Sequence, residues 1–184
     1  MGNYKESIAI IIPALDPDER MVSLVGQLHD DGFSNIILVD DGSLIANRKY
    51  FKTCKETCHC KIIRHVVNFG KGIALKSAFN YILEQRPDIK GAVTVDCDGQ
   101  HVLTDINTCA KLTYEHPDSL ILGCRQFDDK EIPLRSRFGN KLTRQMIRLL
   151  CGIHVSDTQT GLRGLPTPLI REHFANVKGE RFEY

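Results

Sequence analysis

Residues 93–101 read Val-Thr-Val-Asp-Cys-Asp-Gly-Gln-His. An apolar, β-branched run of this kind is typical of a buried strand, and here it ends in two carboxylates one residue apart. Alternate side chains of a strand share a face, so Asp96 and Asp98 can point to the same place. Paired carboxylates hold Mg²⁺ or Mn²⁺ against nucleotide phosphates in many proteins. The stretch therefore predicts either a metal-dependent phosphate site or a polar loop after a buried strand.

Other short apolar runs repeat the pattern of this strand. Together they predict strands at residues 8–12, 36–39, 61–65, 92–95 and 120–122. Helical spacing between these runs predicts four helices. The first begins after Asp16, the second spans about residues 46–57, the third ends near Gln85, and the fourth begins at Thr104. We expect Asp16 and Thr104 to cap their helices. This alternation predicts an α/β fold, a mainly parallel open sheet with helices on both faces.

The bulk composition suits a single domain covering residues 1–184. The chain is 42% hydrophobic and carries a net charge of +1, which provides no general attraction to nucleic acid. No run approaches the roughly 18 apolar residues of a membrane span, and the polar first residues do not resemble a signal peptide. Without an export signal, the seven cysteines are expected to be reduced thiols in a cytoplasmic protein.

Several notable residues directly follow predicted strands. Pro13 follows the first, Asp40 and Asp41 the second, and the Asp96 motif the fourth. Parallel pairing brings these positions to one edge of the sheet, where α/β folds bind ligands. The segment 70–72, Gly-Lys-Gly, either brings Lys71 to an anion at a helix start or forms a turn with a solvated lysine. Dinucleotide and P-loop fingerprints are absent.

Five motifs occur in an order that resembles a known family. They are IIPAL at 11–15, VDDGS at 39–43, NFGKG at 68–72, DCDGQH at 96–101 and DTQTG at 157–161. From about residue 8 to the end, the chain resembles family 2 glycosyltransferases, closest to the branch of dolichyl-phosphate mannosyltransferase and polyprenyl-phosphate glucosyltransferases. The resemblance implies a GT-A fold, a UDP- or GDP-sugar donor, Mg²⁺ or Mn²⁺ as cofactor, and inversion at the anomeric carbon. It also implies a role in cell-envelope glycan synthesis.

The resemblance assigns donor-site roles to matching positions. It implies that Asp98 and Gln100, with Asp96 near the metal or the ribose, hold the metal against the diphosphate. The positions expected around the nucleotide sugar are Pro13, Leu15, Glu19, Val39, Asp41, Lys71, Asp96 and Arg125. Leu15 replaces an aromatic residue common in the mannosyltransferases, and Pro17-Asp18 looks like an insertion. The base is therefore not assigned as guanine.

The acceptor side is predicted from the last third of the chain. Residues 136–150 combine a basic and an apolar stripe, which favours a helix at a membrane surface or lipid phosphate, or else an ordinary soluble helix. The resemblance makes Arg135 and Arg137 candidates to bind a lipid phosphate. Asp157 is the candidate carboxylate that orients or deprotonates the acceptor; its alternative role is a helix or turn cap.

The expected activity is sugar transfer to a polyprenyl phosphate by an enzyme peripheral at the cytoplasmic face of the membrane. Residues 179–184 resemble a motif that continues in the family, often toward membrane helices, so the chain is either a trimmed or a naturally short form. Other hypotheses keep the donor but use a glycan or protein hydroxyl as acceptor, or bind a nucleotide sugar without turnover. A nucleotidyltransferase on a similar sheet is a further alternative.

Overall fold

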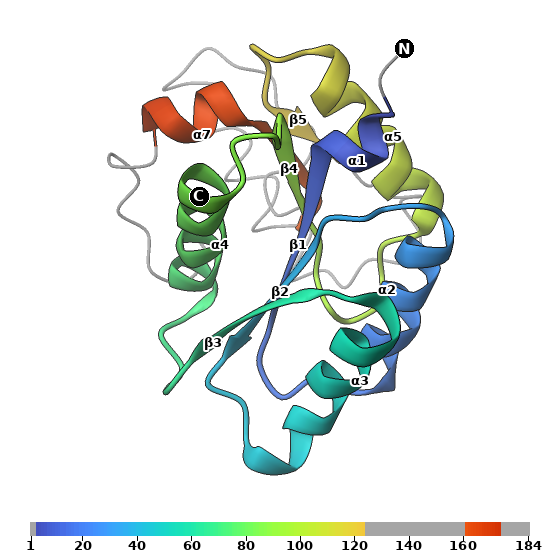
Figure 1. Ribbon diagram of the computed structural model, residues 1–184, viewed down its shortest axis with the longest axis vertical. Coiled ribbons are helices and arrows are strands. Elements are labelled where there is room, and N and C mark those ends of the chain that lie inside the picture. The colour runs from blue at the N-terminus through green and yellow to red at the C-terminus, as the bar shows by residue number, and fades with distance from the viewer. Residues whose placement is uncertain (1–2, 124–160, 174–184) are drawn as a thin grey trace, which may run out of the picture.

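The computed structural model describes residues 3–123 and 161–173. In this part of the chain a six-stranded sheet has the order β3-β2-β1-β4-β6-β5 (Figure 1). Its strands are β1 Ile8–Ala14, β2 Ile36–Asp41, β3 Lys61–His65, β4 Gly91–Thr94, β5 Ile121–Leu122 and β6 Arg163–Pro166. The helices are α1 Tyr4–Ser7, α2 Glu19–Asp30, η1 Ile45–Asn47, α3 Arg48–Cys58, α4 Lys71–Gln85, α5 Leu103–Glu115 and α7 Thr167–His173.

The four strands β3, β2, β1 and β4 pair in parallel, and β6 runs antiparallel between β4 and β5. Ile11 in the central strand β1 lies opposite Ile37 of β2 and Thr94 of β4. All seven residues of β1 and all six of β2 are buried, as expected of strands covered on both faces. The predicted class, a mainly parallel α/β sheet, is confirmed.

Two hydrophobic layers sandwich the sheet. Ile8, Ile10 and Ile12 of β1 pack on one side with α2, α3 and α5, while Ala9 and Ile11 pack on the other with α4 and α7 (Figure 1). This division follows from the alternation of side chains along a strand. None of the helices in the described part of the chain is both long and apolar enough to cross a membrane.

Several predicted element ends needed correction; strand β2, for example, extends to Asp41, a residue that was predicted to follow it. Asp18, not Asp16, caps α2, since its side chain accepts a hydrogen bond from the Arg20 amide at 2.9 Å. Helix α5 begins at Leu103 after Val102, so Thr104 lies inside the helix rather than capping it. Strand β1 continues through Pro13, which is tolerated because β4 no longer pairs with β1 at that point.

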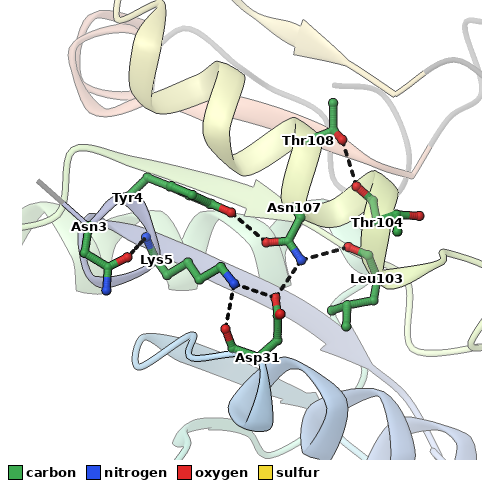
Figure 2. Close-up of polar contacts among 8 residues, drawn as sticks. All are labelled: Asn3, Tyr4, Lys5, Asp31, Leu103, Thr104, Asn107 and Thr108. Atoms are coloured by element: carbon green, nitrogen blue, oxygen red, sulfur yellow. Dashed lines mark hydrogen bonds and ion pairs between the residues drawn. The ribbon is translucent and has the colours of Figure 1, made fainter. Parts of the chain in front are cut away.

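A polar network links α1, the residue that ends α2, and α5 (Figure 2). The side-chain oxygen Oδ1 of Asn107 accepts a hydrogen bond from the Tyr4 hydroxyl at 2.8 Å, and its side-chain nitrogen Nδ2 donates to the Asp31 carboxylate at 2.6 Å. The Lys5 ammonium donates to the Asp31 carboxylate at 2.8 Å and to its backbone oxygen at 2.6 Å. These contacts join segments distant in sequence without touching the carboxyl edge of the sheet.

Candidate active site

The residues predicted to meet at one edge of the sheet do so. Asp40 lies opposite Ala14 at the carboxyl end of β1, and the Val95 amide donates to the Ile11 backbone oxygen at 2.9 Å just beyond β4. Asp41 is the last residue of β2 and Asp96 lies two residues beyond β4, so both stand at the carboxyl ends of the two strands that flank β1. The shared edge is confirmed, and it places the acidic residues where α/β folds bind ligands.

The carboxylate of Asp41 anchors the loop that leads into α4. Its oxygens accept hydrogen bonds from the backbone amides of Phe69 at 3.0 Å and Gly70 at 2.8 Å. His65 Nδ1 lies 2.7 Å from the same carboxylate, and His65 Nε2 lies 2.9 Å from the Ser77 hydroxyl. Because the Asp41 side chain is only 5% exposed, its first role is to fix this loop.

Gly42 allows the loops after β2 and β3 to pack together. Its φ is +83°, and a Cβ at this position would lie 2.3 Å from the Val67 carbonyl carbon. Backbone atoms cannot yield as a flexible side chain can, so only glycine fits here. The contact holds residues 42–45 beside residues 66–69.

The Asp41-anchored loop delivers Lys71 to Asp96. The Lys71 ammonium forms an ion pair with Asp96 Oδ1, so the ends of β2 and β4 are linked through the first residue of α4. Gly70, at φ +96°, precedes this 15-residue helix without a side-chain cap. The unmatched amides of such a helix start attract anions. A cation and a helix N-terminus thus converge near the Asp96 carboxylate.

His101 completes the surroundings of Asp96. Its Nε2 atom is 3.8 Å from Asp96 Oδ2, and the side chain is 7% exposed. Within the part of the chain that the structure describes, this Nε2 atom is buried without a hydrogen-bond partner. The His101 imidazole and then the Lys71 ammonium hold the pKa of the Asp96 carboxyl well below its usual range, although burial opposes them. Asp96 is therefore ionised throughout the neutral pH range.

Residue 161, the last of the DTQTG motif, packs directly on Asp96. Its carbonyl oxygen accepts from the Thr94 hydroxyl at 2.9 Å. A Cβ on Gly161 would lie 2.0 Å from Asp96 Oδ2, a separation that real Cβ atoms do not adopt. The glycine is thus required for the close approach of this motif to the acidic loop.

The donor set of the 96–100 loop fits a hard divalent cation. Asp96 and Asp98 supply carboxylate oxygens and Gln100 an amide oxygen, the ligand types that Mg²⁺ and Mn²⁺ prefer. Asp98 Oδ1 accepts a hydrogen bond from the backbone N–H of Gln100 at 3.0 Å, which closes a tight turn around Gly99, whose φ is +76°. The described residues include no group of three or more His, Cys, Asp or Glu side chains already gathered for a metal. A metal here would therefore need the Gln100 oxygen or a substrate oxygen as well.

The remaining predicted donor-site residues occupy different depths. Pro13 and Val39 lie opposite each other in β1 and β2 and are buried near the carboxyl ends of these strands, so they belong to the core beneath the site. Leu15, directly after β1, is 45% exposed, and Glu19, the first residue of α2, is also exposed. The remaining predicted site residues, Arg125, Arg135, Arg137 and Asp157, lie outside the described residues.

Sequence reasoning missed three neighbours of the site. His65 and Ser77 orient Asp41, and the pairing of His65 with Asp41 across β2 and β3 was the signal that could have identified the first. Asp16, predicted as a helix cap, instead accepts from the Leu44 amide at 2.8 Å and from the Asn47 side chain at 3.0 Å. It thereby ties the loop after β1 to the loop after β2.

The fold, with acidic residues at the carboxyl edge of its sheet, is that of a glycosyltransferase of the GT-A type. The sequence profile described as Glycosyl transferase family 2 matches residues 10–174, so the chain belongs to glycosyl transferase family 2. Among relatives, the UDP-N-acetylglucosamine–dolichyl-phosphate N-acetylglucosaminyltransferase of Methanococcus voltae is 30% identical over 96% of this chain and 76% of its own. An uncharacterized protein of Methanocaldococcus jannaschii is 30% identical over 97% of this chain and 72% of its own.

Solved structures show the same fold. Glucosyl-3-phosphoglycerate synthase of Mycobacterium tuberculosis superposes with a TM-score of 0.62 at 16% identity. The match covers 90% of this chain and 58% of the synthase, so this chain spans little more than half of that protein's length. The same synthase in complex with Mn²⁺, UDP-glucose and phosphoglyceric acid gives a TM-score of 0.62 at 18% identity. The protein is therefore a glycosyltransferase with a GT-A fold, and the predicted family and fold are confirmed.

Proposed function

We propose that this glycosyltransferase moves a sugar from a nucleotide-diphosphate sugar to a polyprenyl phosphate, with Mg²⁺ or Mn²⁺ as cofactor. The observation that carries the proposal is the convergence of an ionised Asp96, the Lys71 ammonium and the start of α4 at one edge of the sheet. This arrangement offers both a cation and backbone amides to a diphosphate, beside carboxylates suited to a metal. The dolichyl-phosphate relative supports the choice of acceptor.

The donor's diphosphate would lie between the 96–100 loop and the start of α4. Asp96, Asp98 and Gln100 would hold the metal, which supplies charge neutralisation for the departing diphosphate. The Lys71 ammonium, which pairs with Asp96 in the structure, lies close enough to this site to pair with a phosphate oxygen of the donor instead. Asp41 would act indirectly by fixing the Phe69–Gly70 backbone and hence the position of Lys71.

The nucleoside would lie along the exposed residues after β1. Leu15 and Glu19 are accessible there, whereas Pro13 and Val39 would shape the floor. Arg125 would lie near the donor. This placement leaves the base open to either uracil or guanine.

The acceptor would approach the sugar from the side opposite the departing diphosphate, which inverts the anomeric carbon. A lipid phosphate is already ionised near neutral pH, so a strong general base is not required. Arg135 and Arg137 would bind this phosphate, and Asp157 would orient it from the segment that leads into Gly161. The enzyme would act at the cytoplasmic face of the membrane, where such lipids present their phosphate.

A transfer assay tests the proposal. Labelled UDP- and GDP-sugars are incubated with Mn²⁺ and either a polyprenyl phosphate or a hydroxyl acceptor. We expect label to enter the lipid fraction, and we expect Asp98→Ala to lower this transfer at least a hundredfold. The control Asp118→Ala removes an exposed carboxylate just before β5, at the other edge of the sheet, and should retain full activity. Transfer to the hydroxyl acceptor alone would show that the acceptor is not a lipid phosphate. Transfer unaffected by Asp98→Ala would refute the metal site.

A further inference from the structure

A basic groove lies between helix α3 and the edge strand β3. It encloses about 520 Å³ and is lined by Arg48, Lys49, Lys52, Lys55, Ile62 and Arg64. Five of these six side chains are cationic, although the whole chain carries a net charge of only +1. Such a local excess of positive charge attracts anions over a distance of about 10 Å. The lining of the groove includes no residue of the 96–100 loop.

Two apolar loops lie at the end of this groove. Leu44 and Ile45 precede α3 and are 65% and 81% exposed, and Val66, Val67 and Phe69 follow β3 at 88%, 53% and 52%. The close contact at Gly42 holds the two loops together. Within the described part of the chain, they hold five of the eight large apolar side chains that are exposed. Clustered exposure of this kind marks an interaction surface.

The charged groove and the apolar loops are continuous. Arg48 Nε donates to the Ser43 backbone oxygen at 3.3 Å, so the first turn of α3 lies against the first loop. Arg64 is separated from Val66 by a single residue and pairs with the buried Asp40 at 2.8 Å. Apolar tips beside a row of lysines and arginines form a surface suited to the boundary between lipid chains and anionic headgroups.

We propose that this surface, the basic groove together with loops 44–45 and 66–69, docks the protein on anionic phospholipid headgroups. The apolar tips enter the headgroup region, and the groove binds lipid phosphates. The proposal deepens the proposed function, since it rests on a lipid acceptor. It brings the carboxyl edge of the sheet, with the donor site, to the membrane in which that acceptor lies.

Vesicle binding tests the surface without donor or acceptor, so its outcome is separate from that of the transfer assay. The full 184-residue chain is sedimented with vesicles of phosphatidylcholine, alone or mixed with phosphatidylglycerol. Each basic side chain near an anionic surface contributes about fivefold to partitioning, so Lys49→Ala/Lys52→Ala/Lys55→Ala should bind about a hundredfold more weakly. Binding should also fall as salt is raised. Burial of one large apolar side chain predicts a loss of about tenfold for Ile45→Ser.

Matched controls are available on other faces. Lys52 and Lys111 are exposed helical lysines with a glutamate four residues on, at 3.7 and 3.9 Å, so Lys111→Ala should bind as wild type while Lys52→Ala loses about fivefold. Leu120→Ser, at the opposite edge of the sheet, controls for Ile45→Ser. Unchanged binding by the triple variant, or equal binding to neutral vesicles, would overturn the proposal. Strong binding to soluble polyphosphate with no effect of Ile45→Ser would overturn it in favour of a soluble polyanion.

Discussion

Replacement of Gly161 by alanine tests whether the DTQTG motif controls the position of Asp96. The added Cβ would lie 2.0 Å from Asp96 Oδ2 and 2.6 Å from its Cγ, whereas real Cβ atoms stay at least 3.0 Å away. The carboxylate must therefore move by about 1 Å, the difference between 3.0 and 2.0 Å. The backbone of Gly161 is not in the left-handed region, so the alanine itself is tolerated.

The displacement should harm catalysis more than stability. A shift of about 1 Å in a positioned group can cost about a hundredfold in rate. The Asp96 side chain can rotate aside, so overpacking should destabilise the fold by only about 1–2 kcal/mol. We therefore expect Gly161→Ala to lose roughly a hundredfold in kcat for sugar transfer. Its thermal unfolding should shift by only a few degrees.

Gly26→Ala is the matched control. Gly26 lies inside α2, and a Cβ there meets nothing within 4 Å. This substitution should leave kcat unchanged and stabilise the fold by about 0.5–1 kcal/mol, because alanine favours a helix over glycine. Transfer at the wild-type rate by Gly161→Ala, or a loss of activity that only parallels unfolding, would show that Gly161 does not position Asp96 for catalysis.

Three further predictions concern stability. Gly42→Ala forces a positive φ and a clash with the Val67 backbone, so the free energy of unfolding in urea should fall by about 3 kcal/mol or more; a loss under 1 kcal/mol would contradict the packing of the two loops. Asn107→Ala removes the partner of the Tyr4 hydroxyl and one hydrogen bond to the Asp31 carboxylate, which keeps its Lys5 contact, so it should cost about 1–3 kcal/mol while kcat stays at the wild-type value; a large drop in kcat would contradict its purely structural role. The folded pKa of Asp96 lies below its unfolded value of 3.8, so its stabilisation is present above pH 3.8 and is lost as pH falls through the folded pKa. The difference in unfolding free energy between wild type and Lys71→Met should thus stay constant from about pH 5 to 8 and shrink below about pH 4, and a difference that grows at low pH would contradict the ion pair.

The sheet was largely predictable because its strands are continuous apolar runs. Residues 8–12 and 36–39 are apolar at nearly every position, the pattern expected of strands that are buried on both faces, so they were predicted as strands. Strand β6 was not predictable, since Arg-Gly-Leu-Pro has no such run. It exists because β4 offers an antiparallel partner and because Gly164 lets the strand pass close to Thr113 and Cys109.

The site was predictable in its members but not in their contacts. The spacing of Asp96 and Asp98 identified the acidic loop, and the parallel topology placed Asp41 at the same edge. No local pattern could show that Asp41 binds the amides of Phe69 and Gly70, because those contacts span 28 and 29 residues. The failure at Asp16 has a similar cause. Asp16 and Asp18 flank Pro17, and either could have capped α2. Asp16 instead accepts a hydrogen bond from the backbone amide of Leu44, which is distant in sequence, and Asp18 caps the helix.

The proposed donor site requires the acidic loop at residues 96–100 to bind a nucleotide sugar through a divalent cation. Thermal unfolding measured with a panel of UDP- and GDP-sugars, with and without Mn²⁺, tests it most directly. At a hundredfold excess over Kd, one nucleotide sugar should raise Tm by about 5–10 °C in the presence of Mn²⁺. The shift should be much smaller without Mn²⁺ and absent in Asp98→Ala. A shift of equal size without the metal, or one retained in Asp98→Ala, would exclude binding of the sugar donor through a metal at this loop.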